Sequence, residues 1–234
     1  MNAITNSLNA IWSSSVGKKI IVAVTGAFLL LFLAGHLAGN LLIYAGRDAF
    51  NTYAALLHDM IHGVGIWLFR VVMVVMVGGH IAATVALTMQ NRAARQAYEC
   101  ETVIQASTAS RTMIISGLAI LAFIIYHILH FTVRVGYDIK VDQAHFTKTG
   151  VERPDAWQMV VDGFQSPLVA LVYIAAMSLL AMHLSHGFAS VFQTLGIRPR
   201  KSAATIQQLS MLYSAVIWAG FVSIPIAIFF GIVK

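Results

Sequence analysis

Five long apolar segments dominate the sequence, and shorter polar stretches separate them. They cover residues 20–44, 66–89, 113–135, 167–192 and 211–233. Each is long enough to cross a hydrocarbon core, which takes about 20 helical residues. The alternation of polar and apolar positions typical of barrel strands is absent, and lipid offers backbone groups no partner, so these segments are predicted to be helices. The pattern therefore predicts an all-α membrane protein, with five transmembrane helices in one bundle formed by residues 1–234.

Two further segments are predicted to form short surface elements. Residues 4–12 are mildly amphipathic and either lie along the membrane surface before the first span or form a frayed terminus. The longest loop covers residues 134–166, and within it residues 154–164 begin with a proline that suits the first turn of a helix. We expect this short helix to cap one face of the bundle.

The composition agrees with this class and excludes several chemistries. Hydrophobic residues make up 59% of the chain and charged residues only 10%. The single Cys100 cannot supply an iron–sulfur cluster, a thiolate zinc site, a disulfide or the paired attachment site of covalent haem. Glycine-rich dinucleotide and phosphate-binding motifs are missing as well. Any redox centre in this chain must therefore depend on histidine, and flavin chemistry must come from another chain.

The distribution of basic residues predicts the orientation. The N-terminal stretch and the second and fourth connections carry eight basic residues, namely Lys18, Lys19, Arg92, Arg95, Arg111, Arg198, Arg200 and Lys201. The opposite side carries six, most of them in the long loop. Short loops decide the positive-inside rule, so we predict a cytoplasmic N-terminus and an outer C-terminus. The net charge of +6 then describes a basic inner rim suited to anionic lipid or a docked protein, and no nucleic acid is expected.

Four histidines lie deep inside four of the five spans, and their depths pair them. His36 and His127 each precede the outer end of a span by eight residues, whereas His80 and His183 each precede the inner end of a span by nine. With a rise of about 1.5 Å per residue, the two pairs are separated by roughly 10 Å along the membrane normal. Ionisable groups are rare in lipid and mark function. The pattern predicts two bis-histidine sites, hence two b-type haems.

Other interpretations of these histidines remain open from spacing alone. A histidine in a transmembrane helix can hydrogen-bond across the bundle, and a transporter can use several histidines to relay protons. His130 follows His127 by three residues, and His186 follows His183 by three, so each lies on nearly the same helical face. Spacing does not decide which member of each pair binds a metal. The other member could donate a hydrogen bond, hold a haem propionate or face a quinone.

An ordered set of motifs resembles a known family over nearly the whole chain. The motifs are SSSVGKK, VTGAFLLLFLAGHLAGN, GGHIAAT, LTMQNRAAR, IIYHILHF, SPLVALVY and AMHLSHGFASVFQTLG. In this order they resemble the five-helix, di-haem cytochrome b subunits of succinate:menaquinone and quinol:fumarate oxidoreductases. The resemblance implies that His36 and His127 bind the outer haem iron and that His80 and His183 bind the inner one. It thereby selects the first histidine of each closely spaced pair.

The resemblance also implies partners and a substrate. Such chains anchor a flavoprotein subunit and an iron–sulfur subunit in the cytoplasmic membrane of a bacterium and exchange electrons with menaquinone. A dimer of the complex is a further expectation. Similar proteins handle quinone near the outer haem, where His58, Asp59 and His62 are candidates for proton exchange here, with solvated loop residues or a helix cap as the alternative. Some relatives carry a glutamate two residues before the fourth ligand, but this chain has Ala181.

Haem propionates need cationic or hydroxyl partners near the membrane faces. Lys19, Arg111 and Arg198 are candidates on the inner side, and Arg70 and Arg134 on the outer side. Each could equally be a snorkelling or positive-inside residue. Two rival functions remain at this stage. One is the haem-binding anchor of another quinone-linked enzyme, such as a hydrogenase or formate dehydrogenase, and the other is a haem-free, proton-coupled transporter.

Overall fold

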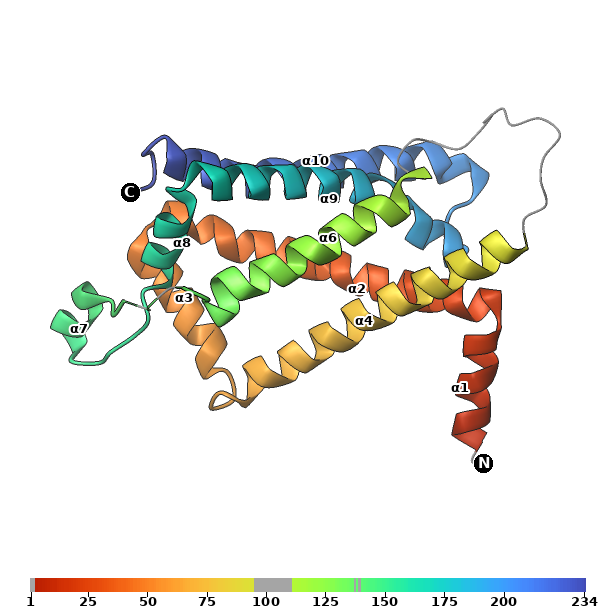
Figure 1. The fold of residues 1–234 in the computed structure, drawn as a ribbon, viewed down its shortest axis with the longest axis horizontal. Coiled ribbons are helices and arrows are strands. Elements are labelled where there is room, and N and C mark those ends of the chain that lie inside the picture. Colours follow the sequence, from red (N-terminus) through yellow and green to blue (C-terminus); the bar gives the residue numbers. More distant parts are fainter. Residues whose placement is uncertain (1–2, 95–110, 137, 139) are drawn as a thin grey trace.

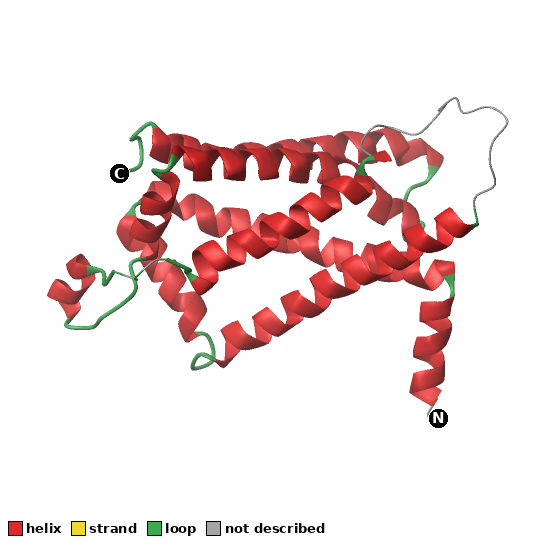
Figure 2. Ribbon diagram, in the orientation of Figure 1, coloured by secondary structure: helices red, strands yellow, loops and turns green. Residues whose placement is uncertain are grey.

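A computed structural model describes residues 3–94, 111–136, 138 and 140–234, and it confirms the five long apolar helices. Helices dominate these residues, which contain no β-strand (Figure 2). Their candidate membrane spans have mean hydropathies of 2.0 to 2.4, so the chain is a multi-pass membrane protein. The five helices are α2 (Ser15–Leu41), α4 (Val64–Ala93), α6 (Met113–His127), α9 (Pro167–Thr194) and α10 (Ala203–Phe229).

Two of the long helices end in a different helical form. The 3₁₀-helix η1 (Leu42–Ala45) continues α2, and the π-helix η2 (Ile128–Val133) continues α6 directly after His127. Arg134 ends η2 in the left-handed conformation, with φ of 64°. The apolar pattern predicted one uniform helix here, because hydrophobicity does not distinguish α from π geometry. π-Helical turns are rare and often occur at functional sites.

Short helices occupy the connections. They are α1 (Ala3–Ser13), α3 (Arg47–Asp59), α7 (Gln143–Thr149), α8 (Ala156–Phe164) and the 3₁₀-helix η3 (Arg200–Ser202). The predicted helices at residues 4–12 and 154–164 correspond to α1 and α8. Helix α8 begins after Asp155, whose side chain accepts a hydrogen bond from the Gln158 backbone, and not at Pro154. Pro154 instead pairs with Val141 in an isolated β-bridge. Helix α3 was not anticipated.

The long helices run side by side between two distinct ends (Figure 1). One end carries α1 and η3 and is called the α1 end, and the other carries α3, α7 and α8 and is called the α8 end. Helix α9 packs along α10 and also contacts α2 and α6, whereas α4 packs mainly on α2. In their most apolar windows, 33% and 39% of the residues of α9 and α10 are buried, compared with 6% in α4 and 11% in α6. Helices α9 and α10 therefore form the protein core, and α4 and α6 lie at its edge.

A buried polar network closes the α8 end. Asn51 on α3 donates hydrogen bonds to Asp142 (2.9 Å) and Asp155 (3.0 Å), and its side-chain oxygen accepts from the Trp157 backbone (2.8 Å). Arg47 pairs with Asp155 as well. Asn51 and both aspartates are only 1% exposed, so each needs these partners. The network ties α3 to α8 and to the loop before it.

Arg153 completes the network from the centre of that loop. Its guanidinium donates to Asp142 (2.9 Å) and to Asp48 (2.6 Å). Burial alone would raise the pKa of Asp142, but hydrogen bonds from Asn51 and Arg153 outweigh this and lower the pKa to about 2. Asp142 therefore stays ionised at every physiological pH, and the loop remains attached to α3.

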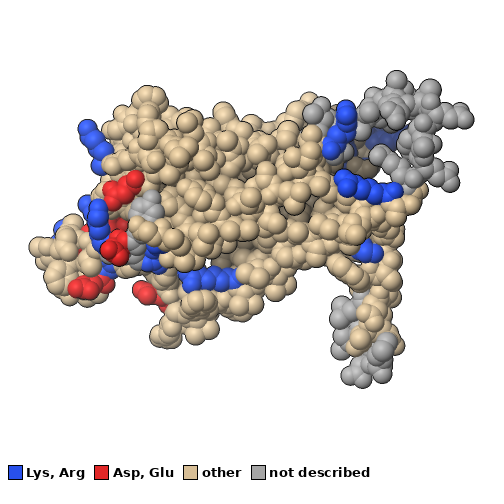
Figure 3. Space-filling model, viewed as in Figure 1, with Lys and Arg blue, Asp and Glu red and all other residues tan. Residues whose placement is uncertain are grey.

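Charge is distributed unequally between the two ends (Figure 3). The described acidic residues all lie at the α8 end, namely Asp48, Asp59, Asp138, Asp142, Glu152, Asp155 and Asp162. All charged residues described at the α1 end are basic, namely Lys18, Lys19, Arg92, Arg111, Arg198, Arg200 and Lys201. The predicted cytoplasmic N-terminus would place the α1 end inside the cell.

Candidate functional site

The structure places the rings of the predicted outer histidines next to each other, in an edge-on arrangement. His36 on α2 and His127, the last residue of α6, have ring centroids 5.9 Å apart and planes inclined by 82°. Two imidazoles bound to opposite sides of one metal ion, with metal–nitrogen bonds of about 2 Å, would place their ring centres about 6 Å apart. The spacing of this outer pair therefore fits bis-histidine ligation, although the two rings come from helices far apart in the sequence.

Aromatic rings surround the outer pair. Phe32 stacks on His36 at 5.2 Å, and Phe221 lies 5.7 Å from the same imidazole. Phe123 and Phe131 flank His127, each at 5.8 Å. Aromatic faces exclude water and supply flat surfaces, so this environment suits a flat, apolar group with histidine ligands.

The inner histidines also lie together, nearer the α1 end. His183 on α9 lies within electrostatic reach of His80 on α4. Each Nδ1 atom lies beside a hydroxyl group of a neighbouring helix. Thr25 Oγ1 is 3.1 Å from Nδ1 of His80, and Ser116 Oγ is 3.2 Å from Nδ1 of His183. These four helices assemble the inner pair.

The two hydroxyl groups select the tautomer of the inner histidines. Thr25 donates its only hydroxyl hydrogen to the Ile21 carbonyl at 2.6 Å, and Ser116 donates its own to the Met113 carbonyl at 3.1 Å. The hydroxyl oxygens are therefore left to accept hydrogen bonds from Nδ1–H of the histidines. This arrangement places the lone pair of each neutral imidazole on Nε2, the form that binds a metal ion.

A glycine directly follows each of these hydroxyl residues. A Cβ atom added to Gly26 would lie 3.4 Å from Cε1 of His80, and one added to Gly117 would lie 3.6 Å from Cε1 of His183. The backbone thus leaves a side-chain-free surface beside each imidazole. Both inner histidines therefore share one local arrangement, in which a hydroxyl residue and a glycine on the adjacent helix hold the ring. A bound macrocycle is compatible with this donor set and these glycines.

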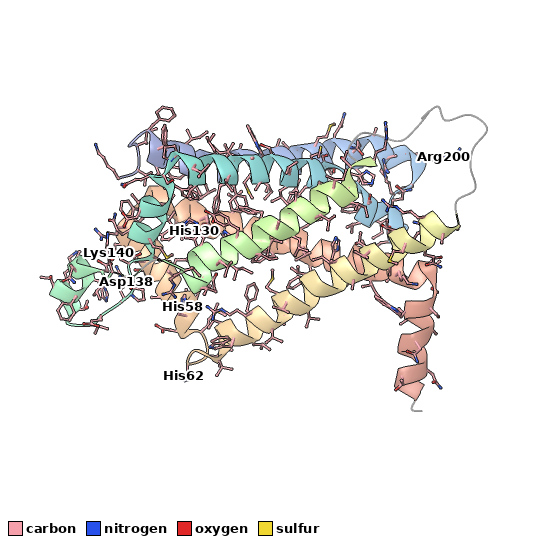
Figure 4. The ribbon with its side chains drawn as sticks, in the orientation of Figure 1. His58, His62, His130, Asp138, Lys140 and Arg200 are labelled. Carbon is pink, nitrogen blue, oxygen red and sulfur yellow. The ribbon has the colours of Figure 1, made fainter. Side chains whose placement is uncertain are left out.

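The closely spaced histidines have different surroundings in the structure. His127, and not His130, contacts the ring of His36. His130 lies in η2, is 6% exposed and packs against Gly163 of α8, where an added Cβ would lie 3.3 Å from its Nε2 (Figure 4). His186 lies within electrostatic reach of Arg198 instead. The arrangement favours the first histidine of each pair as the metal ligand.

Among the candidate propionate partners, Arg198 has the most suitable surroundings. Its Nη1 donates to Gln193 at 3.1 Å and its Nη2 to the Ala203 carbonyl at 3.5 Å, while its buried Nε has no hydrogen-bond partner among the described residues. An orphaned guanidinium N–H at the α1 end suits an anionic group. The chemistry of this donor fits a haem propionate.

The other candidate cations are placed differently. Arg70 lies over the ring of Trp67 at 4.7 Å, and Arg134 ends η2. Lys19 and Arg111 are exposed at the α1 end. Lys18, the residue before Lys19, is buried instead, and its Nζ donates a hydrogen bond to Oε1 of Gln90 on α4 at 3.4 Å. These side chains remain propionate candidates by position only.

The candidate quinone residues lie together at the turn between α3 and α4. His58, Asp59 and His62 are all exposed, and His58 Nδ1 hydrogen-bonds to the Ala54 carbonyl at 2.8 Å. Figure 4 shows His58 and His62 at this turn, at the α8 end and on the same side of the bundle as α4. Among the contacts of the described residues, none joins these three to His36 or His127.

Sequence reasoning missed the residues that orient the histidines. The hydroxyl groups of Thr25 and Ser116 contact the inner histidines. At the outer pair, the hydroxyl oxygen of Tyr173 lies 3.3 Å from Nδ1 of His127, and Nδ2 of Asn40 lies 3.3 Å from Nδ1 of His36. One signal was available for the first two, because each is a hydroxyl residue directly before a glycine inside an apolar span. Their partners are 55 and 67 residues away, so only the fold identifies them.

Fold and site define the class of this molecule as a five-helix membrane protein with two interior histidine pairs. Compared with known proteins, the chain matches no family model, no curated protein and no solved structure. The resemblance to cytochrome b subunits therefore remains an expectation from the ordered motifs of the sequence.

Proposed function

We propose that this chain is the di-haem cytochrome b anchor of a succinate:menaquinone or quinol:fumarate oxidoreductase. The observation that carries the proposal is the contact of His36 with His127, whose ring centroids lie 5.9 Å apart, while His80 and His183 lie within electrostatic reach of each other. In this function the chain passes electrons between menaquinone and an iron–sulfur subunit, which in turn serves a flavoprotein subunit. Succinate oxidation and fumarate reduction use the same parts.

The four histidines have the roles of axial ligands in this proposal. His36 and His127 hold the outer haem, and His80 and His183 hold the inner one. Bound haem b supplies a one-electron carrier at each pair. The hydroxyl groups of Thr25, Ser116 and Tyr173 orient the imidazoles, and the aromatic rings around the outer pair exclude water. Arg198 and His186 hold a propionate at the α1 end.

The two ends of the bundle have different partners in the proposal. The basic α1 end receives the iron–sulfur subunit at the cytoplasmic face, since its described charges are all positive. The α8 end faces outward and receives menaquinol near His58, Asp59 and His62, where exposed groups can exchange protons with solvent. In this proposal the chain is located in the cytoplasmic membrane of a bacterium. The positive-inside distribution of the short connections supports this orientation.

A redox titration of the purified complex tests the proposal. The expected result is two resolved b-type transitions, two haems per chain extracted by pyridine, and co-purification of a flavin-containing subunit. A colourless chain without extractable haem contradicts the proposal and favours a proton-coupled transporter. Two haems with a partner that lacks flavin would instead identify another quinone-linked enzyme, such as a hydrogenase. A flavoprotein without haem in the chain contradicts the histidine assignment.

A further inference from the structure

The hydroxyl group of Tyr173 on α9 lies between two imidazoles at the outer pair. Its oxygen is 3.3 Å from Nδ1 of His127 and 2.9 Å from Nδ1 of His130. Tyr173 and His130 are each 6% exposed, so these contacts form in the interior of the protein. The three side chains come from α6, η2 and α9, and together they connect the bundle interior to the α8 end.

We propose that Tyr173 and His130 form a directed hydrogen-bond chain that lowers the reduction potential of the outer haem alone; this inference rests on the proposed function. A histidine that binds iron through Nε2 carries its proton on Nδ1, so His127 donates to the Tyr173 oxygen. A phenol has one proton, and His130 offers the shorter contact. The chain therefore runs from His127 through Tyr173 to His130.

Packing fixes the members of this chain. Phe123 and Phe164 each lie 4.9 Å from the ring of Tyr173, edge to face. His130 lies against the α8 backbone at Gly163, where an added Cβ would come within 3.2 Å of its Cε1. The π-helical turn η2 begins directly after His127, so His130 does not have the α-helical offset that its spacing suggests. Tyr173 is thus a positioning residue whose hydroxyl has little freedom to turn away.

Among the described residues, the printed partners of the inner pair's Nδ1 atoms are hydroxyl groups that have no second imidazole beyond them. Thr25 and Ser116 pass their hydroxyl hydrogens to backbone carbonyls of their own helices. The hydroxyl group of Tyr173 instead donates its hydrogen to a nitrogen base, and a hydroxyl polarised in this way becomes a stronger acceptor through its oxygen. With this hydrogen-bond chain, His127 is therefore a more electron-rich ligand than it would be beside an unpolarised hydroxyl. An electron-rich ligand stabilises the oxidised iron, which lowers the potential of that haem.

Redox titration of Tyr173→Phe, with Ser116→Ala as the matched control, tests the inference. We expect Tyr173→Phe to bind both haems and to raise one midpoint, with about a tenfold change in the ratio of reduced to oxidised haem at a fixed potential. Ser116→Ala should shift the other transition and leave this one unchanged. The inference is overturned if Tyr173→Phe moves neither midpoint, moves both equally, or moves the transition that Ser116→Ala moves.

Variants of His130 give an independent test that leaves the tyrosine intact. His130→Leu removes the acceptor and should shift the same midpoint in the same direction as Tyr173→Phe. His130→Asn retains an acceptor near the Nδ1 position, so its midpoint potential should remain close to that of the unaltered protein. Identical behaviour of the two His130 variants contradicts the directed chain. Absence of haem from the unaltered protein overturns the proposed function and this inference with it, whereas two haems with unshifted variants overturn the inference alone.

Discussion

The hydroxyl oxygen of Thr25 on α2 lies 3.1 Å from Nδ1 of His80 on α4, and it already donates its hydrogen to its own helix. This contact joins two helices that pack against each other along the edge of the bundle. Thr25, which contacts His80, therefore belongs to the helix that carries His36, so the two histidine pairs are built on shared elements.

Replacement of Thr25 by valine tests whether the hydroxyl orients His80. Valine keeps the shape of threonine but cannot accept a hydrogen bond, so the imidazole loses its preferred tautomer. We expect about a tenfold weaker retention of one haem and little change in the other. The measurement is haem content per chain after purification under increasing detergent stringency. Thr88→Val is the matched control, because Thr88 donates only to the Thr84 carbonyl. Equal retention in both variants would exclude the orienting role.

Removal of single histidines tests the pairing directly. His80→Ala should abolish one b-type transition, and His36→Ala should abolish the other, because each haem then has only one axial ligand. Difference absorption spectra of the purified variants measure this. His62→Ala, an exposed residue of the α3–α4 turn, should retain both transitions. Two intact haems in His80→Ala would show that the inner ligands are wrongly assigned.

The long helices could be predicted from the sequence, because they depend on local properties. Apolar runs of fixed length locate the spans, and the helical rise then places His36, His80, His127 and His183 along the membrane normal. The last helix was the exception. Helix α10 begins at Ala203 and not near residue 211, since its first two turns contain polar residues that an apolar criterion does not include.

Features that depend on tertiary contacts could not be predicted. Helix α3 contains many polar residues and is stabilised by the hydrogen bonds of Asn51 to Asp142 and Asp155, which lie 91 and 104 residues later in the chain. The hydroxyl partners of the inner histidines likewise come from distant segments. Spacing alone likewise did not separate His127 from His130; the family resemblance selected His127, and the fold adds that its ring contacts His36.

The buried carboxylate of Asp142 makes the stability of the α8 end dependent on pH. Hydrogen bonds from Asn51 and Arg153 lower its pKa from 3.8 to about 2 in the folded protein. A carboxylate with a lowered pKa stabilises the fold fully above its unfolded pKa, and this contribution is lost as the pH falls through the folded value. We expect constant stability from pH 7 to 5, then a loss of about 2 kcal/mol between pH 4 and 2. Thermal unfolding at several pH values measures this.

Substitution of Asp142 should reproduce the acid effect at neutral pH. Asp142→Asn leaves Arg153 with a weaker partner, so we expect destabilisation of about 2 kcal/mol at pH 7 and convergence with the unaltered protein in acid. Glu152→Gln, one residue before Arg153 and exposed, should change stability by less than about 0.5 kcal/mol. A pH-independent difference between Asp142→Asn and the unaltered protein would contradict the ionised network.

Arg198 should influence the inner haem through charge. Its buried Nε lacks a partner among the described residues, and a propionate is the anion expected there. Arg198→Gln should lower the potential of one haem, because removal of a nearby cation favours the oxidised, more positive state, and it should weaken haem retention by about 2 kcal/mol. Arg200→Gln, exposed in η3, is the control and should change neither quantity. Redox titration of both variants tests this prediction. If Arg198→Gln shifts the transition that Tyr173→Phe shifts, Arg198 belongs to the outer site and not to the inner one.

The charge difference between the two ends predicts the orientation in the membrane, and cysteine labelling tests it. In a Cys100→Ser background, Val151→Cys at the α8 end and Asn91→Cys at the α1 end each place one thiol at an exposed position. If the basic α1 end is cytoplasmic, a membrane-impermeant maleimide added to sealed spheroplasts should label Val151→Cys and leave Asn91→Cys unmodified. Detergent should then expose both thiols. Labelling of Asn91→Cys in sealed spheroplasts would reverse the orientation and place the proposed quinone residues, with Asp59 among them, on the cytoplasmic side.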